Sequence, residues 1–151
     1  MPEFRFDHVG VAVNSIKPAL SLYRDALGGE YLMGGDEGAS WRWLQLRWPG
    51  GGKVELLEPL GEGFLSRFLG SRGEWLHHVT FKTDDIRAAI GQVEARGYEL
   101  VDVNLDNPHW QEAFVRPSKA YGTLIQIAQS SHPDEAVKDR LRPSNLEELL
   151  S

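Results

Sequence analysis

Hydrophobic and polar residues alternate in two stretches of the chain that resemble each other. The first stretch is residues 6–13 (FDHVGVAV) and the second is residues 76–83 (LHHVTFKT). Alternation with a period of two predicts a β-strand in each. A segment with the apolar spacing of a helix follows each strand, and His8 and His78 take matching places 70 residues apart. We therefore expect a duplicated fold.

Each repeat continues, after its helix, with three further strands. In the first repeat we expect a helix over residues 16–27, stopped by two glycines, and strands over 31–33, 41–48 and 53–58. In the second we expect a helix over 86–96 and strands over 98–103, 112–116 and 123–129. This order predicts an α+β fold of two βαβββ half-modules, over residues 4–59 and 75–129. A bridge with a short helix (60–74) joins them, and a charged, partly helical tail (130–151) follows.

The repeat also aligns residues 53–57 with 123–127, so that Glu55 and Gln126 become equivalent within one residue. Because side chains alternate between the faces of a strand, the aliphatic residues of these strands are expected to pack under the helices. The opposite face then carries four possible metal donors: His8, Glu55, His78 and Gln126. Their neighbours on that face are small (Gly10, Ala12, Thr80 and Ala128), which leaves room for an ion and a ligand.

Composition and charge argue against several functional classes. The 151 residues carry a net charge of -6, and their lysines and arginines are scattered, which argues against nucleic-acid binding. No apolar run approaches the ~20 residues that cross a bilayer, and the N-terminus lacks the apolar core of a signal peptide. Cysteine is absent. We expect a cytoplasmic protein that binds a small molecule.

Donors in these four places make the chain resemble the vicinal oxygen chelate superfamily, which includes glyoxalase I, extradiol dioxygenases and methylmalonyl-CoA epimerase. The likeness covers about residues 4–129 and is closest to the epimerases. It is carried by residues 8–13 (HVGVAV), 54–60 (VELLEPL), 67–69 (RFL), 76–81 (LHHVTF), 84–86 (DDI) and 122–126 (GTLIQ). The resemblance implies a curved mixed sheet around a central cavity, with one divalent metal bound by His8, Glu55, His78 and Gln126. Zinc, cobalt, nickel, manganese and iron all suit this set.

The charges of the donors depart from the family's pattern. Epimerase-like members commonly have glutamine in the second place and glutamate in the fourth, whereas here the order is reversed. A dication with one anionic ligand keeps about one positive charge, which suits stabilisation of an enolate oxygen. The strand over 41–48 lacks the carboxylate expected in epimerases. Glu55 is therefore our candidate catalytic base, with Glu112 and His109 as lesser candidates.

Other polar and aromatic residues have a structural interpretation beside the functional one. His77 shares the core-facing parity of Val79 and is interpreted as structural. Trp41 and Trp43 share a strand face, where they either fill a core or form a wall for the substrate. Arg116 and Lys119 are candidates for binding a carboxylate or the phosphates of a CoA-like group.

The leading hypothesis is a metal-dependent isomerase or lyase, epimerase- or glyoxalase-like, acting on a carbonyl or acyl-CoA-like substrate. The alternatives are an iron-dependent extradiol dioxygenase and a non-catalytic binding protein of the bleomycin-resistance kind. Many relatives of this superfamily are dimers, so we expect a homodimer.

Overall fold

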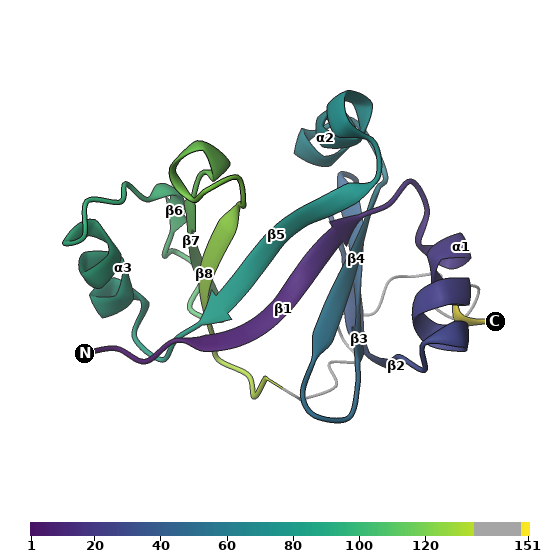
Figure 1. Ribbon diagram of the computed structural model, residues 1–151, viewed down its shortest axis with the longest axis horizontal. Coiled ribbons are helices and arrows are strands. Elements are labelled where there is room, and N and C mark those ends of the chain that lie inside the picture. Colours follow the sequence, from purple (N-terminus) through teal and green to yellow (C-terminus); the bar gives the residue numbers. More distant parts are fainter. Residues whose placement is uncertain (135–148) are drawn as a thin grey trace. The chain divides into compact units, whose positions relative to one another are not determined.

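The computed structural model describes residues 1–134 and 149–151, and it contains two successive βαβββ modules (Figure 1). The first module consists of β1 (Arg5–Ala12), α1 (Ile16–Leu20), η1 (Ser21–Ala26), β2 (Glu30–Glu37), β3 (Trp41–Arg47) and β4 (Lys53–Pro59). The helix α2 (Phe64–Arg72) follows. The second module consists of β5 (Trp75–Lys82), α3 (Ile86–Glu94), β6 (Val101–Asn104), β7 (Trp110–Val115), η2 (Pro117–Lys119) and β8 (Ile125–Ser130).

The eight strands belong to one mixed sheet with the order β2-β3-β4-β1-β5-β8-β7-β6. Within each module the first strand pairs in parallel with the last, and the remaining pairs are antiparallel. Gly10 is paired with Glu55 in the first module, and Thr80 with Gln126 in the second. These registers confirm both the α+β class and the predicted repeat.

The chain forms two compact units whose boundaries fall inside β1 and β5. One unit contains Met1–His8 and His77–Asp134, and the other contains Val9–Leu76 together with the C-terminal residues. His8 is therefore the last residue of its segment, although its strand continues without a break to Ala12.

In the unit that contains Val9–Leu76, aliphatic side chains of α1 pack against those of β3 and β4. Ile16 and Leu20 lie four residues apart on one face of the helix and are fully buried against Leu44, Leu46 and Leu56. Each such side chain contributes ~1.5–3 kcal/mol through burial. The predicted apolar face of these strands is thus confirmed.

The helix after β1 differs from the single helix predicted over residues 16–27. Its α-helical part ends at Leu20, and the chain widens into the π-helical segment η1. Leu27 N–H donates to the carbonyl of Leu22, five residues back. Trp48 holds this end of the helix, because its Nε1 donates to the Leu27 carbonyl over 2.7 Å.

In the other unit α3 covers β7 and β8. Ile86 and Ala89 pack against Ala113, Val115 and Ile127. Asp85 caps the helix by accepting from the Ala88 N–H over 3.0 Å. The helix ends two residues earlier than expected, and Gly97 follows with a φ of +89° that favours glycine.

Two observed strands differ in length from the predicted ones, and the backbone conformation and pairing explain the difference. The strand over 31–33 extends to Glu37, because Gly34 and Gly35 continue the antiparallel pairing with Leu44 and Trp43. The strand over 98–103 is observed only from Val101 to Asn104. Its pairing with β7 shifts register near Asp102, whose φ of +50° breaks the extended conformation.

The C-terminal tail was expected to be helical in pieces. Residues 135–148, including a capping box expected at Ser144 and Glu147, lie outside the described residues. Leu149 is buried, and Leu150 packs against the cluster below α1. In the part of the chain that the structure describes, no helix is long and apolar enough to cross a membrane.

Candidate metal centre

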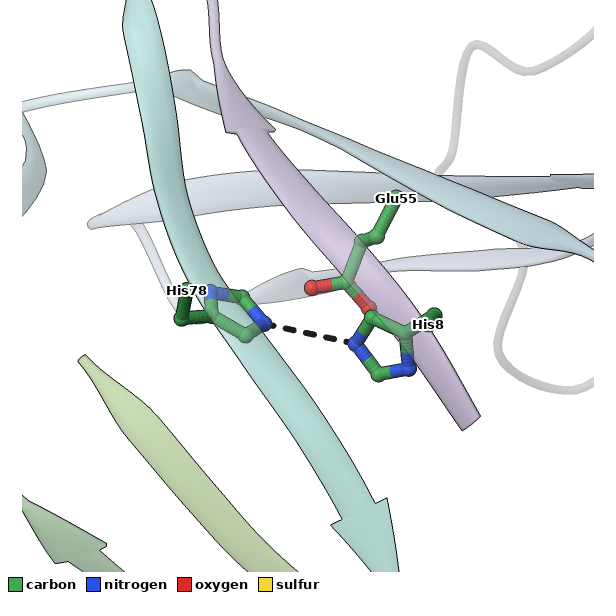
Figure 2. A group of neighbouring side chains, drawn as sticks. All are labelled: His8, Glu55 and His78. Carbon is green, nitrogen blue, oxygen red and sulfur yellow. Dashed lines mark hydrogen bonds between the residues drawn. The ribbon is translucent and has the colours of Figure 1, made fainter. Parts of the chain in front are cut away.

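Two buried imidazoles face each other on the central strands. His8 of β1 and His78 of β5 are hydrogen-bonded through their Nε2 atoms, which lie 3.3 Å apart; the dashed line in Figure 2 joins them. The rings meet edge to face, with centroids 5.4 Å apart. His8 is 1% exposed and His78 is 6% exposed. Two nitrogen donors at this distance, shielded from water, are the kind of pair that a metal ion holds.

The neighbouring residue in each strand contacts the other nitrogen of each ring. Asp7 Oδ2 lies 2.7 Å from His8 Nδ1, and His77 Nδ1 lies 2.9 Å from His78 Nδ1. A carboxylate only accepts hydrogen bonds, so His8 Nδ1 carries the hydrogen and Nε2 of the neutral ring keeps its lone pair. This is the arrangement that orients a metal-binding histidine. His77 was interpreted as structural, and it is half-buried beside His78.

Gln126 of β8 reaches the same pair through Thr80. Thr80 Oγ1 donates to Gln126 Oε1 over 2.6 Å and lies 3.1 Å from His8 Nε2. Thr80 is fully buried and Gln126 almost so. The structure therefore gathers three of the four predicted donors within one unit: His8, His78 and Gln126.

The amide group of Gln126 is oriented from its other side by β7. Its Nε2 donates to Glu112 Oε2 over 3.4 Å, and Trp110 Nε1 donates to Glu112 Oε1 over 3.2 Å. With both amide atoms assigned by these partners, Oε1 is directed to the Thr80 hydroxyl, which in turn contacts His8 Nε2.

Glu55 lies on β4 in the other unit, where it is buried and paired across the ladder with Gln45. Gln45 Nε2 donates to Glu55 Oε2 over 2.7 Å. Gln45 Oε1 is also buried, and it has no hydrogen-bond partner among the described residues. A buried acceptor without a hydrogen-bond partner lowers the stability of the fold unless a donor or a cation contacts it.

These side chains fit a divalent cation by their chemistry. Two imidazole nitrogens, one carboxylate and one amide oxygen are ordinary ligands for zinc and its neighbours. The Thr80 hydroxyl has one hydrogen but faces two acceptors, Gln126 Oε1 and His8 Nε2. A cation could bind the lone pairs of both acceptors in place of this hydroxyl.

Trp41 and Trp43 lie on the same strand face as Glu55, because they precede its partner Gln45 by four and two residues. They pack below α2 with Leu65 and Phe68, and Trp41 meets Phe64 edge to face. The structure thus places them in a small core. Both remain half-buried rather than fully enclosed, so a substrate wall stays a prediction.

Glu37 at the end of β2 is a carboxylate on this face that the sequence analysis missed. It is paired with Trp41 across the antiparallel ladder. Partial desolvation raises the pKa of Glu37, a hydrogen bond from Trp43 opposes this, and the charge of Glu55 raises it further. The strand was predicted to end at residue 33, because glycine is uncommon in strands and Gly34 and Gly35 follow.

The two cationic candidates are exposed, whereas a further arginine, Arg42, is paired. Arg116 directly precedes the turn η2 and Lys119 is its last residue; both are exposed and lie in the same unit as the histidine pair. Arg42 is buried in a bidentate ion pair with Asp36, whose second hydrogen bond is 2.9 Å long. Arg42 is therefore structural, and Arg116 and Lys119 stay candidates for binding a substrate.

Three further residues near the donors could have been found from the sequence. Asp7 directly precedes His8, and carboxylates commonly orient metal-binding histidines. Thr80 and Lys82 share the parity of His78 along one strand. Thr80 was noted for its size alone, although its hydroxyl contacts two of the predicted donors.

The chain resembles proteins of known family along most of its length. Residues 7–114 match the model of the Glyoxalase/Bleomycin resistance protein/Dioxygenase superfamily. Mouse mitochondrial methylmalonyl-CoA epimerase is 32% identical over 136 residues, which cover 83% of this chain and 73% of the mouse protein.

Solved structures give the same picture. Methylmalonyl-CoA epimerase from Mycobacterium tuberculosis has a TM-score of 0.74 at 26% identity, covering 84% of this chain and 88% of that one. A variant of the Streptomyces coelicolor epimerase, in complex with 2-nitronate-propionyl-CoA, has a TM-score of 0.72 at 25% identity, covering 84% and 94%. The protein described here belongs to the Glyoxalase/Bleomycin resistance protein/Dioxygenase superfamily.

Proposed function

We propose that this protein is a divalent-metal-dependent epimerase or isomerase that stabilises the enolate of an acyl-CoA-like thioester. The observation that carries the proposal is the buried histidine pair, whose Nε2 atoms lie 3.3 Å apart with the Gln126 oxygen linked to them through Thr80. Similarity to methylmalonyl-CoA epimerases supports the reaction class.

The proposed ligands are His8, Glu55, His78 and Gln126. The register of the parallel ladder supports the inclusion of Glu55. Glu55 is paired with Gly10, and Gly10 lies two residues beyond His8 on the same face of the continuous strand β1. The carboxylate is therefore expected beside the imidazole. His8, Glu55 and His78, drawn together in Figure 2, are all buried, and each offers one ligand atom.

The chemistry follows from the charge of this set. A divalent cation supplies Lewis acidity, which favours negative charge on the carbonyl oxygen of a substrate. One carboxylate among the four ligands leaves a net positive charge, which suits an enolate. The buried side chains exclude water, so that this attraction is weakly screened.

Proton transfer at the α-carbon requires a base, and we propose Glu55 for this role. Two further carboxylates are now alternatives: Glu37 of β2, paired with Trp41 of β3, and Glu112, beside Gln126. A raised pKa, as at Glu37, favours a carboxyl group that must both take and return a proton. Substitution of each carboxylate by glutamine distinguishes the three.

The substrate class is proposed from the relatives and from the side chains of this protein. The Streptomyces epimerase is described in complex with an acyl-CoA analogue. Here Arg116 and Lys119 are exposed and positively charged, which suits the phosphates of a CoA group. Trp41 and Trp43 offer half-buried aromatic surface to the acyl portion.

The test is α-proton exchange. Protein loaded with Co²⁺ or Zn²⁺ is incubated in D₂O with methylmalonyl-CoA and other 2-substituted acyl-CoA thioesters, and the α-proton signal is followed by NMR. We expect exchange that disappears when the metal is chelated. The control is Lys17→Met, an exposed change on α1, which should leave the rate unchanged. A metal-loaded protein that exchanges no α-proton across the panel would refute the proposed reaction.

A ring-cleaving dioxygenase is the second candidate, because two histidines and one carboxylate also form the iron site of many oxygenases. Oxygen uptake with catechols under Fe²⁺ decides between the two enzymes. A non-catalytic binding protein is the third. It predicts a protein that binds an aromatic ligand without metal and is unaffected by His8→Ala. The homodimer stays a prediction, which sedimentation velocity tests.

A further inference from the structure

Seven side chains of one unit form a closed circuit of contacts that begins and ends at His8. In order, they are His8, Asp7, Lys82, Trp110, Glu112, Gln126 and Thr80. The circuit contains two of the proposed metal ligands, His8 and Gln126. Thr80 joins the inward-facing atoms of these two ligands, His8 Nε2 and Gln126 Oε1. The other four members contact the outer atoms of the ligands, His8 Nδ1 and Gln126 Nε2, or link those contacts together.

Lys82 is the only cationic side chain of the circuit apart from the imidazole. Its side chain is 3% exposed, and its Nζ lies 3.5 Å from Asp7 Oδ1 and 3.3 Å from Asp134 Oδ1. The ammonium group also lies 5.8 Å from the centre of the Trp110 ring, a cation–π contact. A buried ammonium needs such partners, because its desolvation is otherwise costly.

The strand register places Lys82 on the face of the candidate metal centre. It lies two and four residues beyond Thr80 and His78 on β5. Its partner on β8 is Ala128, which is in turn the partner of Glu112. Lys82, Ala128 and Glu112 therefore lie in one row across β5, β8 and β7. Because the side chain of Ala128 is small, the long side chain of Lys82 has space between β1 and β7.

The second carboxylate near Lys82 has a separate partner. Burial raises the pKa of Asp134, but the Arg5 hydrogen bond and the charge of Lys82 outweigh it, and the net effect lowers that pKa. Arg5 Nε donates to Asp134 Oδ2 over 3.0 Å. Lys82 also forms an ion pair with buried Asp7, whose Oδ1 lies 3.5 Å from Nζ.

We propose that Lys82 is a positioning residue that determines which atoms of His8 and Gln126 face the metal. This inference rests on the proposed function, because it assigns those two residues as ligands. On the first arm, Lys82 holds one oxygen of Asp7, and the other oxygen accepts the Nδ1 hydrogen of His8. The lone pair of Nε2 then faces inward.

The second arm runs through Trp110. Its ring lies under the ammonium group, and its Nε1 donates to one oxygen of Glu112. The other oxygen of Glu112 accepts from Gln126 Nε2, so Gln126 Oε1 faces inward. One buried charge therefore acts on two ligands that come from different strands, β1 and β8.

A purely structural lysine is the alternative to this proposal. It would lower stability when replaced, without changing the tautomer of His8 or the affinity for a metal beyond what unfolding explains. The two roles are separated by measurements on folded protein.

The experiment compares the wild type with Lys82→Met and Lys82→Arg. In metal-free protein, the ¹⁵N chemical shifts of His8 Nδ1 and Nε2 report the tautomer. Co²⁺ affinity is measured by competition with a chelating dye. We expect one Nδ1–H tautomer in the wild type and a mixture in Lys82→Met, with ~10–100-fold weaker Co²⁺ binding. Lys82→Arg keeps the cation and should recover most of both.

The outcomes distinguish this inference from the proposed function. A wild type without Co²⁺ affinity refutes the metal site, and the ligand assignment on which this inference rests fails with it. A wild type that binds Co²⁺, with Lys82→Met unchanged in tautomer and affinity, overturns the role of Lys82 alone. Should Lys82→Met not fold, Trp110→Phe replaces it. That variant keeps an aromatic ring but removes the hydrogen bond to Glu112, and unchanged Co²⁺ affinity would overturn the second arm.

Discussion

Replacing Thr80 by valine should make the protein less stable without metal and improve its affinity for metal. The Thr80 hydroxyl donates to Gln126 Oε1 over 2.6 Å and lies 3.1 Å from His8 Nε2. Both acceptors are proposed metal ligands, so the hydroxyl competes with the ion for the same lone pairs. Valine keeps the shape and the strand preference of threonine but lacks the hydroxyl.

The magnitude follows from burial. Thr80 is fully buried, and in metal-free Thr80→Val the Gln126 oxygen would lose its hydroxyl donor at a cost of ~1–3 kcal/mol. For a chain of this length, that corresponds to a fall in Tm of ~2–4 °C per kcal/mol. In the metal-bound protein the ion satisfies the same oxygen, so the two variants should differ much less. By the thermodynamic cycle, the metal then binds the variant ~5–150-fold more tightly.

The assay is thermal and urea denaturation with and without saturating Co²⁺, together with direct titration of the metal. Thr83→Val is a control on the same strand end, because Thr83 is also buried but its hydroxyl accepts from the Asp85 N–H. That change should lower stability equally with and without metal. If Thr80→Val instead bound Co²⁺ more weakly than the wild type, the hydroxyl would support the ligands, and the competition argument would be refuted.

Three further changes test other parts of the structure. His78→Ala should abolish stoichiometric metal binding, which elemental analysis of the purified protein measures; retention of one equivalent of metal would contradict the ligand set. Glu37 has a folded-state pKa above its unfolded value, so its stabilising effect is present at low pH and is lost as pH rises through the folded pKa. Glu37→Gln should therefore raise the Tm of metal-free protein at neutral pH and leave it unchanged in acid, and a pH-independent difference would count against this. Asp85→Ala removes the cap that accepts from Ala88 and should cost ~1 kcal/mol in urea unfolding, with unchanged metal affinity.

Much of the fold was predictable because the second module repeats the hydrophobic and polar pattern of the first. The alternation around His8 and His78 predicted the two central strands, and the shared offset predicted the pairing of Glu55 and Gln126 with equivalent positions. The observed registers, Gly10 with Glu55 and Thr80 with Gln126, agree with it. Periodicity determines which face of a strand a side chain takes, and it predicted a shared face for the candidate donors, whose binding of a metal stays a prediction.

The missed features depend on contacts that periodicity does not encode. Asp7 has the opposite parity to His8, yet its carboxylate reaches the His8 ring because the two residues are adjacent. Gly34 and Gly35 have no β-propensity, and only their pairing with β3 reveals the strand that presents Glu37. The π-helical turn after Leu20 likewise depends on tertiary contacts such as that of Trp48 with the Leu27 carbonyl.

Among the described residues, two lysines are buried, and their accessibility to reagents can report how the molecule opens. Lys82 lies in one compact unit and Lys53 in the other, and both are at most 4% exposed. Amine-acylating reagents would modify the outer lysines first and reach these two only during transient separation of the strands. Peptide mass spectrometry after timed labelling would then report the rate at which each unit opens transiently, without any engineered tag or dye.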